Sequence, residues 1–196
     1  MPDNRNTSNS YQGHMRPAGL EPDDARLAAE TMQEQLTALL DLSLTLKHVH
    51  WNVVGPGFLG VHEMLDEHVD KVRRMADALA ERVATLGYMP NGLVGYVSNH
   101  RDHPDYALGR ATVEAHLGAL DHLYSQVIGS HREAAVTTED PDPVTNDILI
   151  GQTGELEQLQ WLLRAHIENV SGRVPSAEEP NQLEAAKVAA SSDPLA

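Results

Sequence analysis

The 196-residue sequence contains no cysteine, which excludes disulfide bonds, thiolate metal sites and thiol nucleophiles. Aromatic residues supply only 4% of the chain. A core must therefore be built from Leu, Val, Ala and Met, which favours a helical bundle over a β-sandwich. No apolar run approaches the roughly 20 residues that span a bilayer, and none follows the N-terminus. We therefore expect no membrane span, no signal peptide and a cytoplasmic protein.

Basic charge is also scarce, because 14 Lys and Arg stand against 29 Asp and Glu, for a formal net charge of −15. This balance argues against a globally basic nucleic-acid-binding protein. An acidic surface usually serves solubility alone. A specific attraction for small cations needs carboxylates and imidazoles at defined positions, and the sequence contains such a set.

Apolar residues recur at helical spacing in four long stretches that contain little proline. The predicted long helices cover about 23–54, 59–86, 113–135 and 139–172. A break of about twenty residues separates the second helix from the third. Because a structureless connection of that length is unusual in a compact bundle, we expect a short helix near 93–99. Four long helices with a crossover after the second form a four-helix bundle.

Glycine and proline mark where the first two helices end. Gly55-Pro56-Gly57 breaks the first, and Gly87 is suited to the left-handed residue that stops the second. The flanking segments lack helical periodicity and are rich in small and polar residues. The predicted organisation is a disordered N-terminal tail at 1–22, a bundle domain at 23–172 and a flexible C-terminal tail at 173–196. A fraying helical turn is expected at 183–190.

The candidate metal ligands are His50, His62, Asp66, Asp77 and Glu81. His62 and Asp66 are four residues apart, as are Asp77 and Glu81, so each pair shares a helical face. Imidazole with carboxylate suits iron, zinc or manganese, and mixed sites with open positions favour iron redox chemistry. The four residues on the second helix span an arc of roughly 100°, centred about 120° from its apolar stripe. The ligand face is therefore not the face that packs the core.

Asp66 and Asp77 are eleven residues apart, or about 16 Å along a helix axis. No single metal ion, and no pair of ions about 4 Å apart, can bridge that distance within one chain. Two copies of the helix packed antiparallel across a two-fold axis would bring His62 and Asp66 of one chain to Asp77 and Glu81 of the other. His50 can join His62 across the glycine turn. The sequence therefore predicts two equivalent sites at a subunit interface.

Other metal chemistries fit less well. His62-Glu63-Met64-Leu65-Asp66 resembles the HExxH helix of zinc proteases, but its fifth position is Asp rather than His. No Glu is followed by His three residues later, so the Glu-x-x-His pairs of intrasubunit di-iron bundles are absent. His48 lies two residues before His50 and points elsewhere on the helix.

The candidate ligands belong to a longer motif made of Lys47-His48-Val49-His50-Trp51-Asn52, Gly55, Phe58, His62-Glu63-Met64-Leu65-Asp66, Asp77 and Ala80-Glu81-Arg82. This motif resembles the Dps family (DNA-binding proteins from starved cells), and it is most similar to the actinobacterial members. The resemblance covers about residues 24–170 and includes Gly154-Glu155-Leu156-Glu157 and Trp161. All five candidate ligands stand at the family's spacing.

The resemblance implies an all-α, ferritin-like four-helix bundle with a short extra helix in the second-to-third connection. It also implies a dodecameric cage built from two-fold dimers. The implied activity is ferroxidase, in which an inter-subunit site holds two iron ions and oxidises ferrous iron, with hydrogen peroxide preferred over dioxygen. A ferric oxyhydroxide mineral would then be stored in the cavity, which protects the cell from oxidative damage.

Two further sets of residues take roles from the same resemblance. Trp51 has two compatible roles, an aromatic that packs at the interface and a sacrificial electron donor that takes part in catalysis beside the site, whereas Trp161 is expected to pack. Family members line an acidic, three-fold iron-entry pore with residues at the positions of Glu139, Asp140, Asp142 and Asp147. The alternative for each of these carboxylates is a solvated helix start favoured by the helix dipole.

DNA binding is poorly supported by the two tails. Residues 1–20 hold two Arg and one Asp, a net of +1, and residues 171–196 hold two basic and four acidic residues, a net of −2. Binding through counterion release needs many phosphate contacts. A nucleoid-compacting protein with a secondary metal site, and with it nucleoid association, remains the alternative function. A cage with a degenerate site is a third, against which the complete ligand set speaks.

Overall fold

The computed structural model describes residues 16–168 and 172–191. These residues form helices and two very short strands in the following order: α1 (Pro22–Asn52), β1 (Val53–Val54), α2 (Phe58–Thr85), α3 (Val94–His100), β2 (Ala111–Thr112), α4 (Val113–Thr138), α5 (Pro143–Ile167) and α6 (Gln182–Ser191). The all-α fold class is confirmed. Among the described helices, none has the length and apolarity needed to cross a membrane.

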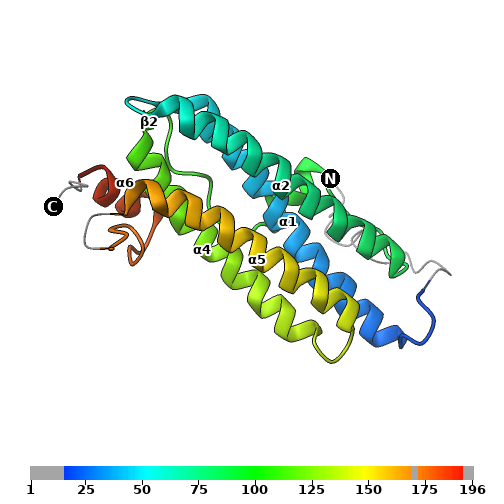
Figure 1. Ribbon diagram of the computed structural model, residues 1–196. Helices are drawn as coiled ribbons and strands as arrows, with labels where there is room; N and C mark the ends of the chain where they lie inside the picture. Colours follow the sequence, from blue (N-terminus) through cyan, green and yellow to red (C-terminus); the bar gives the residue numbers. More distant parts are fainter. Residues whose placement is uncertain (1–15, 169–171, 192–196) are drawn as a thin grey trace.

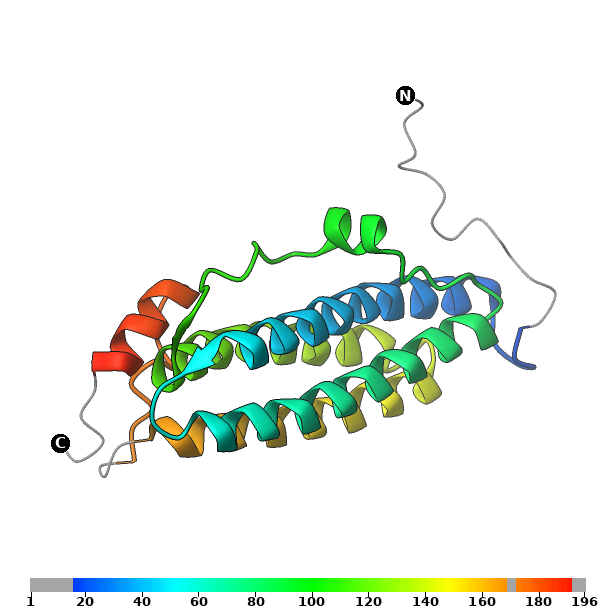
Figure 2. The same ribbon diagram turned by 90° about the horizontal axis from the view of Figure 1, so that it is seen from above.

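The four long helices form a bundle of two hairpins, α1 with α2 and α4 with α5 (Figure 1). The connection from α2 to α4 runs back along the length of the bundle and carries the short helix α3, as the view in Figure 2 shows. This crossover confirms the predicted topology. Its return is fixed by a parallel pairing of β1 with β2, in which Val53 lies opposite Ala111.

The core is built from the aliphatic residues that the composition predicts. The stripe on α2 is buried, and the exposed fraction is 4% or less for Leu65, Val69, Val72, Ala76, Leu79, Val83 and Leu86. Tyr124 is the one fully buried aromatic residue in the described part of the core. The glycines of the first break, Gly55 and Gly57, have φ values of 101° and 75°, and Gly87 has 88°. Left-handed backbone of this kind favours glycine, so the predicted helix stops are confirmed.

Helix boundaries differ from the predicted ones by a few residues. Helix α1 begins at Pro22, one residue before the predicted start at 23, because proline is suited to the first helical position. Helix α5 ends at Ile167, five residues before the predicted stop at Gly172, and residues 169–171 lie outside the described residues. Most of the predicted N-terminal tail, residues 1–15, also lies outside them.

The C-terminal segment differs most from expectation. Instead of a fraying turn, residues 182–191 form α6, which packs against α4 and buries Ala185, Ala186 and Ala189. Gly118 on α4 permits this close approach. A Cβ at Gly118 would stand 2.5 Å from the carbonyl oxygen of Ala185 and 2.7 Å from the Cβ of Ala189. The contact joins positions more than 60 residues apart, which periodicity in α6 alone does not reveal.

Substituting Gly118→Ala should therefore loosen α6 from α4. In open helical surroundings Gly→Ala stabilises a protein by up to about 1 kcal/mol, so the clash at Gly118 reverses the usual sign. Hydrogen exchange of residues 182–191 should become faster in the variant. Gly129→Ala is the matched control, because Gly129 lies on the same helix with nothing within 4 Å of its Cβ position. Equal exchange in both variants would contradict this packing.

Candidate functional site

His50 and His62 lie together where α1 ends and α2 begins. Their rings stack with centroids 3.6 Å apart and an interplanar angle of 22°. The Nδ1 of each histidine is 2.9 Å from the backbone carbonyl oxygen of the other. Because a carbonyl oxygen only accepts, Nδ1 must donate in both rings. The lone pair of each imidazole is therefore on Nε2, the arrangement of a histidine prepared to bind a metal ion.

Asp66 completes this group one helical turn after His62. Its Oδ1 lies 3.4 Å from Nδ1 of His50 and 2.7 Å from Nζ of Lys47. The hydrogen bond from Lys47 is the main reason that the pKa of Asp66 lies below its ordinary value, with His50 and His62 adding to the effect. The carboxylate is thus ionised and its charge is balanced by an ammonium group. The structure brings three of the five candidate ligands together.

Asp77 and Glu81 are exposed on α2, well removed from this group. The exposed side of α2 carries both of them, which agrees with the prediction that the ligand face is not the core face. In the part of the chain that the structure describes, no three His, Asp or Glu side chains are arranged to hold a metal ion. The single chain therefore presents two separate groups, one of two imidazoles with a carboxylate and one of two carboxylates.

Lys47 was not assigned a role from the sequence. It lies three residues before His50, so it shares a helical face with that histidine, and this spacing was the available signal. Its side chain is only 22% exposed and its Nζ also lies 5.8 Å from the ring centroid of Trp51. The ammonium group occupies the position beside Asp66 where an incoming cation would bind.

Replacing this ammonium group should strengthen cation binding at Asp66. In a Lys47→Gln variant we expect tighter binding of Zn²⁺, a redox-inert probe, because the ammonium group no longer competes for Asp66. The gain should be only a few-fold, since an exposed ion pair contributes little free energy. Calorimetric titration of the assembled protein measures the change. Lys187→Gln is the control, since Lys187 pairs with Glu184 on α6. Unchanged or weaker zinc binding in the first variant would contradict the competition.

Both tryptophans are exposed in the single chain. Trp51 is 72% exposed, and Leu44 on α1 and Phe58 and Leu59 on α2 are between 45% and 57% exposed. Trp161 on α5 is 62% exposed. The packing expected of this residue therefore does not occur within the single chain. An exposed apolar group of this size around His50 and His62 is typical of a surface that contacts another protein chain.

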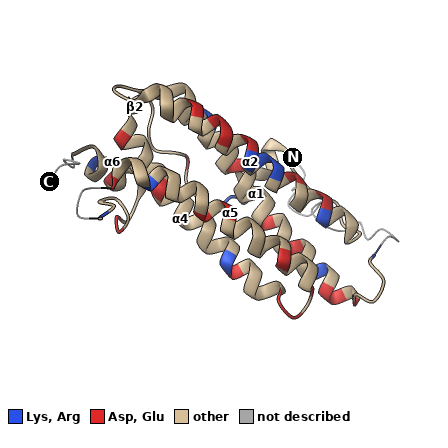
Figure 3. Ribbon diagram, in the orientation of Figure 1, with Lys and Arg blue, Asp and Glu red and all other residues tan. Residues whose placement is uncertain are grey.

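The four predicted pore carboxylates are not equivalent. Glu139, Asp140 and Asp147 are exposed, and acidic residues gather at the turn between α4 and α5 (Figure 3). Asp142 is buried and pairs with Arg82 at 2.6 Å. Its burial would raise its pKa, but hydrogen bonds from Thr145 and Arg82 outweigh burial and hold the pKa below its ordinary value. Asp142 is therefore a structural residue, and the prediction that it lines a pore is corrected.

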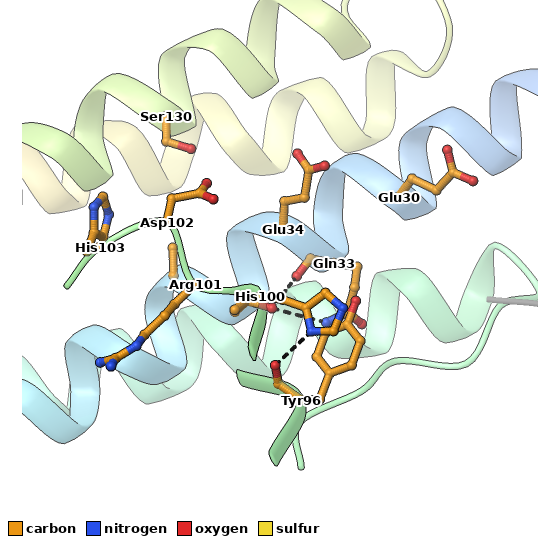
Figure 4. A pocket seen from close by; sticks show the side chains of 11 residues that line it. Glu30, Gln33, Glu34, Tyr96, His100, Arg101, Asp102, His103 and Ser130 are labelled. Carbon is orange, nitrogen blue, oxygen red and sulfur yellow. Dashed lines mark hydrogen bonds between the residues drawn. The ribbon is translucent and has the colours of Figure 1, made fainter. Parts of the chain in front are cut away.

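A separate polar cavity of about 440 Å³ lies between α1, α4 and the crossover segment. Glu34, Asp102 and Ser130 surround the same space (Figure 4). Burial, followed by repulsion from Asp102 and Glu30, raises the pKa of Glu34 above its ordinary value. None of the predicted ligands lines this cavity, and its carboxylates are not grouped closely enough to hold a metal ion.

Comparisons with known proteins cover the whole bundle. A family model described as a ferritin-like domain matches residues 29–172. The "DNA protection during starvation protein" of Mycolicibacterium smegmatis is 50% identical over 156 residues, which is 80% of this chain and 85% of that protein.

Two solved structures are also similar. "Mycobacterium smegmatis Dps" has a TM-score of 0.82 and 47% identity, and covers 84% of this chain and 94% of its own. "DpsA14 from Streptomyces coelicolor" has a TM-score of 0.81 and 47% identity, and covers 83% of this chain and 97% of its own. These similarities include the segment that carries every candidate ligand.

Proposed function

We propose a function from one established premise: this chain belongs to the ferritin-like family and, within it, to the Dps proteins. It is a ferroxidase that oxidises ferrous iron at a site shared by two subunits and stores the ferric product as a mineral. The observation that carries this proposal is the division of the ligands. His50, His62 and Asp66 form one group, and Asp77 and Glu81 form another on the same exposed side of α2.

In the proposed two-fold dimer, the two groups of ligands come together into complete sites. With two α2 helices antiparallel, each histidine group meets the partner's carboxylate pair, which gives two sites of five ligands each. Nε2 of each histidine binds ferrous iron as a neutral donor, while the three carboxylates offset the charge that grows on oxidation. Two ferrous ions held in one site supply both electrons that hydrogen peroxide needs to become water. No single-electron step then releases hydroxyl radical.

The exposed apolar residues around the site support a second copy of the chain as the partner surface. Trp51 follows His50 in the chain and Phe58 lies edge-on to His62. Burying these exposed side chains in a dimer removes their apolar area from water. By family membership, six such dimers form the dodecameric cage. Glu139, Asp140 and Asp147 then form an acidic ring at a three-fold pore, where carboxylates concentrate divalent cations. The cage is proposed to act in the cytoplasm.

Anaerobic stopped-flow oxidation of ferrous iron by peroxide tests this function. The assembled protein should oxidise two ferrous ions per peroxide, faster with peroxide than with dioxygen, and His62→Ala should abolish the fast phase. His122→Ala is the control, because His122 lies on α4, away from the ligand group. One iron oxidised per peroxide, with hydroxyl radical trapped in solution, would contradict the proposal.

Binding of DNA is the second candidate, because the curated relative is a DNA protection protein by name. The acidic C-terminal segment and the small positive charge of residues 1–20 weigh against strong phosphate binding. A gel-shift assay at physiological salt separates the two functions. Retarded DNA together with slow iron oxidation would favour the nucleoid role, with the metal site secondary.

A further inference from the structure

Tyr106 and His116 form a hydrogen-bonded pair that the proposed function does not use. The Oη of Tyr106 lies 3.0 Å from Nδ1 of His116, and the rings are nearly parallel at 11° with centroids 6.0 Å apart. His116 is fully buried in the first turns of α4. Tyr106 comes from the crossover segment, next to Ala107, whose N–H donates to Gln182 of α6. Three elements therefore hold the pair in place.

The phenol oxygen of Tyr106 lies 3.0 Å from Nδ1 of His116 and 3.4 Å from the backbone carbonyl oxygen of the same residue. Nε2 of His116 is buried and has no hydrogen-bond partner within the described residues. In the neutral tautomer that carries its proton on Nε2, Nδ1 is an acceptor and the Tyr106 hydroxyl can donate to it.

One aromatic contact joins the pair to α1, the helix that carries His50. The ring of His48 lies edge-on to Tyr106, with centroids 5.9 Å apart. His48 is on the last turns of α1, two residues before His50 and three before Trp51, or about 3 and 4.5 Å along the helix axis. Tyr106 thus lies beside the last turns of α1, which carry His48, His50 and Trp51.

Burial sets both members of the pair in the protonation state that electron donation requires. Burial raises the pKa of Tyr106, so the residue is a phenol and not a phenolate. Burial, as the largest effect, lowers the pKa of His116, so the imidazole is neutral and able to accept a proton. A phenol that loses an electron becomes a strong acid, and in a buried site it needs a base within hydrogen-bond distance. His116 supplies that base.

We propose that Tyr106 donates one electron to the iron site when only one ferrous ion is present, and that His116 accepts its proton. This inference rests on the proposed ferroxidase function. Hydrogen peroxide takes one electron from ferrous iron and one from Tyr106, and with two protons from water it becomes two water molecules. The O–H bond of Tyr106 breaks and an N–H bond forms at Nδ1 of His116, which leaves a neutral tyrosyl radical beside an imidazolium.

A second ferrous ion that arrives later restores the pair. It transfers one electron to the tyrosyl radical, and the proton returns from His116 to the phenol oxygen. The net reaction is again two ferrous ions per peroxide, with the two electrons delivered at different times. With Tyr106 as the second electron donor, a site that holds only one ferrous ion can still reduce peroxide by two electrons.

Freeze-quench electron paramagnetic resonance tests the inference on the assembled protein. Peroxide is added anaerobically after loading with either one or two ferrous ions per site, and the rate of iron oxidation is followed in parallel. We expect a tyrosyl signal several-fold larger at one ion per site than at two. Tyr106→Phe, which preserves the ring, should remove most of that signal while oxidation at two ions per site is unchanged.

Matched variants identify the residue and its base. Tyr96→Phe is the control, since Tyr96 stacks on His100 in α3 without a hydrogen bond from its phenol to that ring among the described contacts. His116→Gln, which retains an acceptor but no base, should shorten the lifetime of the radical. A signal that persists in Tyr106→Phe and disappears in Tyr124→Phe would overturn the inference, because Tyr124 forms the other such pair with His68.

The ferroxidase function and the role of Tyr106 are contradicted by different results. Slow iron oxidation at two ions per site in the unmodified protein would remove the proposed function itself. Fast oxidation with no tyrosyl signal at one ion per site would leave the ferroxidase intact and overturn the role of Tyr106.

Discussion

An Asp77→Ala variant is expected to oxidise ferrous iron roughly 100-fold more slowly than the unmodified cage, since even outer partners of metal ligands cost 10–100-fold when removed. The reason is geometric. Asp77 is about 16 Å along α2 from Asp66, so within its own chain it cannot take part in a site with the two histidines. The loss would occur although His50, His62 and Asp66 are untouched. Stopped-flow oxidation by peroxide measures it.

Asp70→Ala is the matched control for this variant. Asp70 is an exposed carboxylate on the same helix, between the two ligand groups, and it belongs to neither. We expect it to keep nearly the full rate. Size-exclusion chromatography must show intact cages in both variants, so that a slow rate reports the site and not the assembly. Equal rates for Asp77→Ala and Asp70→Ala would contradict the assignment of Asp77 as a ligand.

The second large effect is a loss of stability in acid that arises from His131. This histidine is fully buried in the bundle, and burial, as the largest effect, lowers its pKa from 6.5 to about 4. The folded state therefore requires the neutral imidazole, whereas the unfolded chain binds a proton below about pH 6.5. The stabilisation is fully present above pH 6.5 and is lost as the pH falls towards 4. The loss from this residue is roughly 3 kcal/mol.

Urea unfolding at a series of pH values from 7 to 4 measures this dependence. Replacing His131 with Gln removes the titrating group and keeps a polar side chain beside Gln152, so the variant should lose less stability than the unmodified protein over the same range. Because a cage does not unfold in one step, the comparison is between the two pH profiles rather than between absolute free energies. Parallel profiles would contradict the assignment of the acid sensitivity to His131.

The helices could be predicted from the sequence because their signals are local. The stripe from Leu65 to Leu86 and the glycines at 55, 57 and 87 are read within one or two turns of helix. The exposed position of Asp77 and Glu81 on α2 was also predictable, since angular position on a helix follows from residue spacing alone.

Features that depend on contacts between distant residues could not be predicted. The pairing of Asp142 with Arg82 is one example, because Arg82 lies 60 residues earlier in the chain and nothing local indicates the contact. A helical turn was expected at 183–190, but its packing as helix α6 against α4 was not, because that contact depends on the distant Gly118. The exchange of hydrogen bonds between His50 and His62, which leaves both Nε2 atoms free, likewise appears only when α1 and α2 are folded together.

The central claim is that each site takes ligands from two subunits, and a complementation measurement tests it most directly. Subunits carrying His62→Ala and subunits carrying Asp77→Ala are dissociated, mixed in equal amounts and reassembled, and peroxide-driven iron oxidation is then measured. About half of the dimers are mixed, and in each of these one of the two sites is intact by symmetry. The account predicts recovery to about one quarter of the unmodified rate, the product of these two halves. A mixture no more active than its two parents would show that the ligands do not meet across the interface.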